Sequence, residues 1–127
     1  MKTMNNGIIY RKLKKQLFGD KEYKHVFFFN SRNIRRKMPS DLIAAYKLFK
    51  ENLPEEEQKD VCLVLHTAPV DGNGTDLYAV RDLLLGEDDS VRFSTAKLAT
   101  EGMNYLYNLA DATVLPSSNF STLRLTI

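Results

Sequence analysis

From residue 25 onward, the sequence alternates between short, continuously apolar runs and longer segments whose apolar residues recur at helical spacing. A short apolar run is typical of a strand buried on both faces, and apolar residues three and four positions apart are typical of an amphipathic helix. Strands that alternate with helices predict an α/β domain with a parallel sheet. The four predicted strands are His25 to Asn30, Val61 to His66, Val91 to Ser94 and Ala112 to Leu115.

The segments between these strands carry helix signals. Pro39 suits the first turn of a helix that is expected to end near Asn52. Thr75 or Asp76 can cap a second helix, and a third is expected to begin by Thr100. Each predicted pair of consecutive strands is therefore joined by a helical crossover, as a parallel sheet requires.

Because such crossovers are right-handed, these elements predict a three-layer, Rossmann-like parallel sheet of strand order 3-2-1-4, with helices on both faces. In this arrangement the chain changes direction between strands one and four. Ligands bind at that point, beyond the carboxyl ends of the strands. We therefore expect a ligand crevice between the strand ending at Asn30 and the strand ending at Leu115.

The bulk properties of the chain fit one ordinary globular domain, with 127 residues of which 43% are hydrophobic. Its longest apolar run, from Val61 to Leu65, is far too short to cross a bilayer, and the N-terminus lacks a signal-peptide pattern. These features predict a cytoplasmic protein without a transmembrane segment. The single cysteine, Cys62, cannot form an internal disulfide and is expected in the core.

Residues 1–24 are predicted to be a basic linker or N-terminal extension that precedes a Rossmann-like domain of residues 25–127. They contain seven basic and two acidic residues, a net charge of +5, and the rest of the chain carries −3. A basic arm can attract nucleic acid or an anionic membrane, although this one has no recognised motif for specific nucleic-acid binding. One hypothesis is thus a non-catalytic interaction module that binds nucleic acid or an acidic partner through this arm. The alternative is a solvated helix or linker.

The loop after the first predicted strand is strongly cationic, with four basic side chains within six residues: Arg32, Arg35, Arg36 and Lys37. Arginine can grip phosphate oxygens through two parallel N–H bonds, lysine adds a point charge, and a following helix offers backbone N–H groups. The loop lies at the expected crevice, which favours an anion site. The sequence leaves open whether it binds an anion or is simply a charged surface loop.

His66 ends the second predicted strand, at the same edge of the sheet. A histidine there can act in catalysis or can hydrogen-bond locally as a structural residue, and no second histidine or carboxylate is placed to complete a triad. The two histidines and one cysteine show none of the usual ligand spacings, so no metal site is predicted.

Several of these segments fit together into one family pattern. Ser31 and Arg32 are followed after four residues by Lys37 and then by a helical segment at 41–46, DLIAAY, and residues 106–117 read LYNLADATVLPS. These segments resemble the carboxyl-terminal, donor-binding domain of GT-B glycosyltransferases, in particular the retaining group called group 1 or family 4. The resemblance implies a nucleotide-sugar substrate, such as a UDP-, GDP- or ADP-sugar, and no separate cofactor.

The resemblance further implies that Arg32 and Lys37 bind the donor diphosphate and stabilise charge on the leaving nucleotide. Other polar residues at the same edge are candidates for contact with the donor. They are Ser31, His66, Ser94, Thr95, Ser117, Ser118 and Asn119.

After Ser118 the sequence departs from the family. The family's Glu-Gly-Phe-Gly-Leu stretch and its second glutamate are absent, and so are the last helices of the lobe and the acceptor-binding lobe. The sequence therefore predicts a fragment of a nucleotide-sugar-dependent glycosyltransferase that is not active alone. An incomplete sheet also predicts an unpaired edge beside the fourth strand, and with it self-association into a homo-oligomer.

Overall fold

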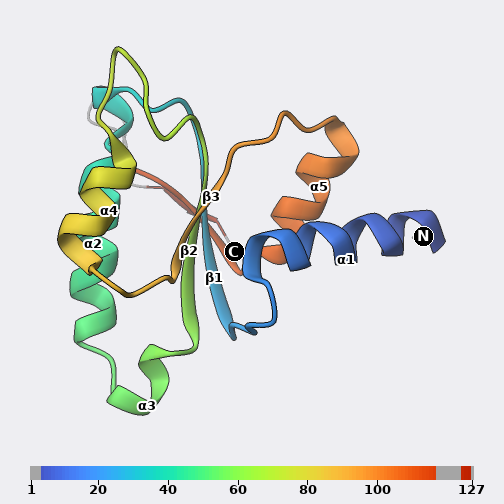
Figure 1. The fold of residues 1–127 in the computed structure, drawn as a ribbon, viewed down its shortest axis with the longest axis horizontal. Helices are drawn as coiled ribbons and strands as arrows, with labels where there is room; N and C mark the ends of the chain where they lie inside the picture. Colours follow the sequence, from blue (N-terminus) through green and yellow to red (C-terminus); the bar gives the residue numbers. More distant parts are fainter. Residues whose placement is uncertain (1–3, 117–123, 127) are drawn as a thin grey trace.

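In the computed structural model of this protein, residues 4–116 and 124–126 are described. Five strands form one sheet in the order β3-β2-β1-β4-β5 (Figure 1). The strands β1 to β4 run parallel to one another, so the predicted α/β fold with a parallel sheet of order 3-2-1-4 is confirmed. The strand bounds are β1 His25–Asn30, β2 Val61–His66, β3 Val91–Ser94, β4 Ala112–Leu115 and β5 Arg124–Thr126.

Helices cover both faces of the sheet and make the fold a three-layer sandwich (Figure 1). One face is covered by α2 (Pro39–Glu51) and α4 (Leu77–Leu85), and the other by α1 (Met4–Phe18) and α5 (Thr100–Leu109). Two shorter helical segments are η1 (Arg35–Lys37) and α3 (Glu55–Gln58). Among the described residues, no helix combines the length and the apolar character needed to cross a membrane.

The two hydrophobic cores follow from the alternation of side chains along the central strands. Phe29 of β1 belongs to the core beneath α2 and α4, and its neighbour Phe28 belongs to the core beneath α1 and α5. On β2 the same alternation divides five consecutive buried residues between the two faces. Both faces of each central strand are therefore apolar, from Val26 to Phe29 in β1 and from Val61 to Leu65 in β2, which is the reason for the continuous apolar runs in the sequence.

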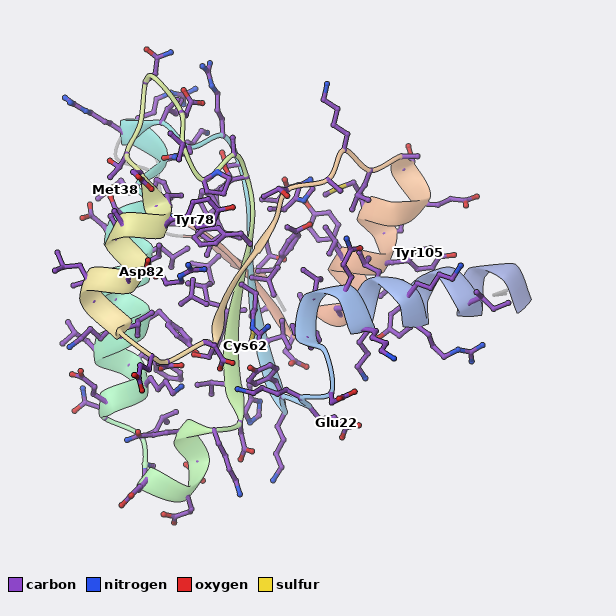
Figure 2. All side chains as sticks on the ribbon, in the orientation of Figure 1. Glu22, Met38, Cys62, Tyr78, Asp82 and Tyr105 are labelled. Carbon is purple, nitrogen blue, oxygen red and sulfur yellow. The ribbon has the colours of Figure 1, made fainter. Side chains whose placement is uncertain are left out.

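Cys62 lies near the amino end of β2, an interior strand of the sheet (Figure 2), and is fully buried. Burial raises the pKa of its thiol to about 12, so the thiol stays protonated at physiological pH. The side chain packs in the same core as Phe28 and Leu106, where it serves as a small apolar residue.

The N-terminal extension contributes to this core. Its residues 4–18 form α1, and the last turn of α1 buries Leu17 and Phe18 beside Val26 of β1. Farther along the helix, the ring of Tyr10 meets the ring of Tyr105 on α5 edge to face, with ring centroids 6.0 Å apart. The apolar side of α1 therefore packs against the domain, and its basic residues are left on the outer side.

The edge beside β4 differs from the expectation. β5 pairs there in the antiparallel direction, with Leu125 opposite Val114. The prediction of an unpaired edge beside the fourth strand is therefore wrong, because residues 124–126 supply the missing hydrogen-bonding partner. The expectation of self-association depends on that edge, and the pairing removes the reason for it.

Candidate anion-binding edge of the sheet

A row of polar side chains crosses the carboxyl ends of the central strands. The strand register aligns Asn30 with His66 and His66 with Ser94. The His66 Nδ1 atom lies 2.8 Å from the Ser94 Oγ atom, and the Asn30 side-chain amide donates a hydrogen bond of 2.9 Å to the Tyr107 hydroxyl of α5. The structure thus brings together His66 and Ser94, which the sequence placed at the same edge without indicating contact.

The environment of His66 favours the neutral imidazole. Partial burial lowers the pKa of His66, and a hydrogen bond to the Ser94 backbone opposes that shift without reversing it. The partner of the ring is a hydroxyl group and not a carboxylate, so the pair lacks the third member of a catalytic triad. In this setting His66 orients Ser94 and offers its other ring nitrogen for hydrogen bonding.

Arg32 follows β1 and is held by a carboxylate from the loop that follows β2. The Arg32 Nε atom lies 3.0 Å from the Asp71 Oδ2 atom. The Arg32 side chain is 60% exposed and that of Asp71 only 13% exposed, so the guanidinium is oriented from one side and open to solvent on the other. The hydrogen bond from Arg32, with a second from the Asn73 backbone N–H, lowers the pKa of Asp71.

Asn33, the next residue, joins the two loops more firmly. Its side chain is fully buried, and its amide nitrogen donates to the backbone carbonyls of Ala68, Pro69 and Thr75 at 3.1, 3.1 and 2.7 Å. The sequence reasoning missed this residue because it stood within a cationic run. The available signal was a short amide side chain beside a second loop rich in turn-forming residues, PVDGNG, at 69–74.

Gly74 lets that second loop approach Asn33 closely. A Cβ atom at position 74 would lie 2.1 Å from the Asn33 backbone oxygen and 2.6 Å from its Oδ1 atom, distances that no side chain tolerates. We define the Asn33 clasp as Asn33 with Gly74 and the three carbonyls that Asn33 binds. The clasp sets the position of Arg32, since Arg32 immediately precedes Asn33 in the chain.

Gly74→Ala is expected to lower the free energy of unfolding by about 1 to 3 kcal/mol, because the methyl group forces the two loops apart. Gly72→Ala is the matched control, since a Cβ atom there meets nothing within 4 Å. The control is expected to change stability by less than about 0.5 kcal/mol. Urea denaturation followed by circular dichroism measures both variants. Equal losses in the two would show that the close approach at Gly74 does not matter.

Lys37 lies at the amino end of α2. It is the last residue of η1, and Met38 then adopts a left-handed backbone conformation, with φ of 56°, that turns the chain into α2 (Figure 2). Met38 makes no side-chain hydrogen bond to the first turn of α2. The backbone N–H groups and dipole at such a helix end favour an anion, and Lys37 adds a positive charge next to it.

An apolar cavity of about 490 Å³ lies between α2 and the part of the sheet formed by β1, β2 and β4. Its lining includes Phe27 of β1, Leu42 and Tyr46 of α2, and Val114 and Pro116 at the end of β4. Arg32 and Lys37 are not part of this lining. The cavity therefore suits an apolar group, and the cationic loop lies outside it.

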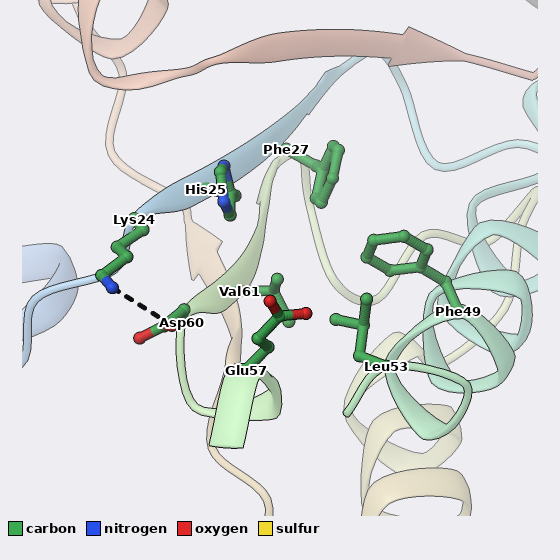
Figure 3. A pocket seen from close by; sticks show the side chains of 8 residues that line it. All are labelled: Lys24, His25, Phe27, Phe49, Leu53, Glu57, Asp60 and Val61. Carbon is green, nitrogen blue, oxygen red and sulfur yellow. Dashed lines mark ion pairs between the residues drawn. The ribbon is translucent and has the colours of Figure 1, made fainter. Parts of the chain in front are cut away.

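A second cavity, of about 420 Å³, lies at the opposite edge of the sheet, at the amino ends of β1 and β2 (Figure 3). Its polar residues include His25, Glu57 and an ion pair in which the Lys24 Nζ atom is 3.7 Å from the Asp60 Oδ2 atom. Ligands of parallel α/β sheets bind at the carboxyl ends of the strands, so this cavity lies at the less favourable edge.

The remaining predicted site residues lie at the same carboxyl edge or beyond the described part of the chain. Ser31 follows β1 and is partly buried, and Thr95 follows β3 and is exposed. Ser117, Ser118 and Asn119 fall outside the described residues. Within the described part, no group of three or more histidine, cysteine, aspartate or glutamate side chains could hold a metal ion.

No family model matches the sequence, and no curated protein matches it significantly. The function must therefore be inferred from the residues of this chain and from their arrangement.

Proposed function

We propose that this chain binds the diphosphate of a nucleotide sugar and forms the donor-binding part of a retaining glycosyltransferase. Arg32 and Lys37 are the phosphate-binding residues in this proposal. The observation that carries it is the cationic loop at the carboxyl end of β1. That strand pairs with both β2 and β4, so the loop lies at the change of direction in the sheet, where α/β folds bind their ligands.

The local geometry supports an anion as the ligand. Arg32 is oriented by Asp71 and is still largely exposed, and Lys37 precedes a helix whose first turn receives no side-chain cap. A diphosphate would thus meet an arginine, a lysine and a helix amino end from one loop. Asp71 competes for the same guanidinium, so the phosphate is expected to bind on the side of Arg32 that faces solvent.

The chemistry of such a site is electrostatic. When the bond between the sugar and a nucleoside diphosphate breaks, negative charge grows on the leaving phosphate oxygens. Fixed cations that contact these oxygens stabilise this charge without rearranging during the step. In the proposed arrangement, Arg32 supplies a directional N–H contact and Lys37 a point charge. The Asn33 clasp keeps Arg32 in place.

Isothermal titration calorimetry with UDP, GDP and ADP tests the proposal. At least one nucleoside diphosphate is expected to bind, and Arg32→Ala is expected to weaken binding by about 1.5 to 3 kcal/mol, the range for a hydrogen bond to a charged group. This corresponds to roughly 10- to 150-fold in the dissociation constant.

Lys59→Ala is the matched control, because Lys59 is an exposed lysine that precedes β2 at the opposite edge of the sheet. It removes one positive charge without altering the cationic loop, so binding should be unchanged. The proposal fails if no nucleoside diphosphate binds. It also fails if the control weakens binding as much as Arg32→Ala, because the effect would then reflect net charge alone.

A further inference from the structure

The outer side of α1 is a cationic surface. Within the part of the chain that the structure describes, its basic side chains are exposed and none forms an ion pair with a carboxylate. The basic residues of α1 are Arg11, Lys12, Lys14 and Lys15. Elsewhere on the domain, Lys21, Lys50 and Arg32 each pair with an aspartate. The helix itself contains no acidic residue, so its charge is not compensated along its length.

The helix has two distinct sides. Leu13 and Leu17, four residues apart, face the core, and Tyr10 contacts Tyr105 of α5. Arg11 and Lys15 are also four residues apart. Together with Lys12, they lie on the solvent-exposed side of the helix. We define the α1 cationic face as Arg11, Lys12 and Lys15. In the view of Figure 1, the amino-terminal turns of α1 extend beyond α5. The three side chains of the α1 cationic face are exposed.

We propose that the α1 cationic face binds the phosphate backbone of a nucleic acid without sequence preference. An uncompensated row of exposed arginine and lysine on one side of a helix is complementary to a regular row of phosphates. A B-DNA major groove is about 12 Å wide and admits an α-helix, whose side chains then reach the phosphates on its rims. Contacts of this kind position a protein on the duplex and carry no base specificity.

An anionic membrane is the less suitable polyanion for this face. A helix that binds at a membrane surface inserts its apolar side between the lipids. In α1 that side is already used, because Leu17 and Phe18 are buried in the core and Leu13 packs against it. Binding at a membrane would have to rely on the cations alone. The proposal is also separate from the nucleotide-sugar site, because α1 lies on the face of the sheet opposite α2.

Fluorescence anisotropy of the full chain with a labelled DNA duplex of arbitrary sequence tests the proposal. The key variant combines Arg11→Gln, Lys12→Gln and Lys15→Gln. Because it removes three cations that each meet a phosphate in the proposed complex, binding at 0.1 M salt is expected to weaken on the order of 100-fold or more, and the slope of log K against log salt to become shallower by about 3. These side chains are exposed, so the midpoint of thermal unfolding should be unchanged.

The matched control combines Lys47→Gln, Lys59→Gln and Lys97→Gln, which changes net charge equally but on other surfaces. Its binding is expected to stay close to that of the wild type. The proposal is overturned if the control loses as much affinity as the α1 variant, or if wild-type binding does not depend on salt. It is also overturned if vesicles containing phosphatidylserine bind more tightly than the duplex and lose binding in the same α1 variant. That result would assign the face to a membrane.

Discussion

Phe18→Ala is expected to lower the free energy of unfolding by about 3 to 5 kcal/mol, the usual range for deleting a buried phenylalanine ring. Phe18 is only 3% exposed, and its ring packs edge to face on Tyr23 with the centroids 5.5 Å apart. Its removal leaves a cavity between α1 and the sheet. A domain of this size is commonly stable by only about 5 to 15 kcal/mol, so the loss is a large part of the total.

Ile8→Ala on the same helix is the matched control for this loss. Ile8 is 40% exposed, so its truncation is expected to change stability by less than about 0.5 kcal/mol. Chemical denaturation followed by circular dichroism measures both variants on one scale. If Phe18→Ala has as little effect as Ile8→Ala, α1 is an appendage and not a structural part of the domain, as the predicted division into an extension and a separate domain implies.

Asn33→Asp is expected to cost about 3 to 5 kcal/mol at neutral pH, because it places an unpaired carboxylate in the buried clasp. The asparagine amide donates to three carbonyl oxygens, and a carboxylate of the same shape would face them with a negative charge. Asn73→Asp is the control. It makes the same chemical change at an exposed position of the neighbouring loop and is expected to change stability by less than about 0.5 kcal/mol.

The decrease in the free energy of unfolding caused by Asn33→Asp should also depend on pH. Burial among carbonyl oxygens raises the pKa of the new carboxyl in the folded state above its value in the unfolded chain. The destabilisation caused by the charged carboxylate is therefore absent below the pKa of the unfolded chain, about 3.9. It grows as pH rises from there through the pKa of the folded state. The stability gap between this variant and the wild type, measured by urea denaturation, should narrow between pH 7 and pH 4. A gap that is constant with pH would mean that the loss is steric.

The strands and most helices could be predicted because their patterns are local. The four parallel strands have the predicted bounds, and Asp76 caps α4 by accepting a hydrogen bond from the Ala79 N–H, as its residue type suggests. The packing role of α1 was hidden because its apolar side is narrow and its many cations are typical of a solvated arm. β5 was hidden because three residues are too few to show a strand pattern.

The candidate site could be located from the sequence but its contacts could not. The topology of the sheet follows from the sequence pattern, and it places Arg32, His66 and Ser94 at the carboxyl edge of the sheet. The pairing of Arg32 with Asp71, 39 residues away, depends on how two loops fold over each other. A local pattern contains no information about such a contact, and a cationic run gives no sign that a carboxylate from a distant loop will meet it.

The antiparallel strand β5 also affects how the sheet ends. In a doubly wound sheet, the next strand beside β4 would be parallel to it. Here β5 occupies that position and runs antiparallel to β4. The longest strands, β1 and β2 with six residues each, lie inside the sheet, while the edge strands β3 and β5 have four and three. Short edges present few backbone groups to a neighbouring chain. Such a sheet is a poor template for aggregation through its strands, even though its interior is continuously apolar.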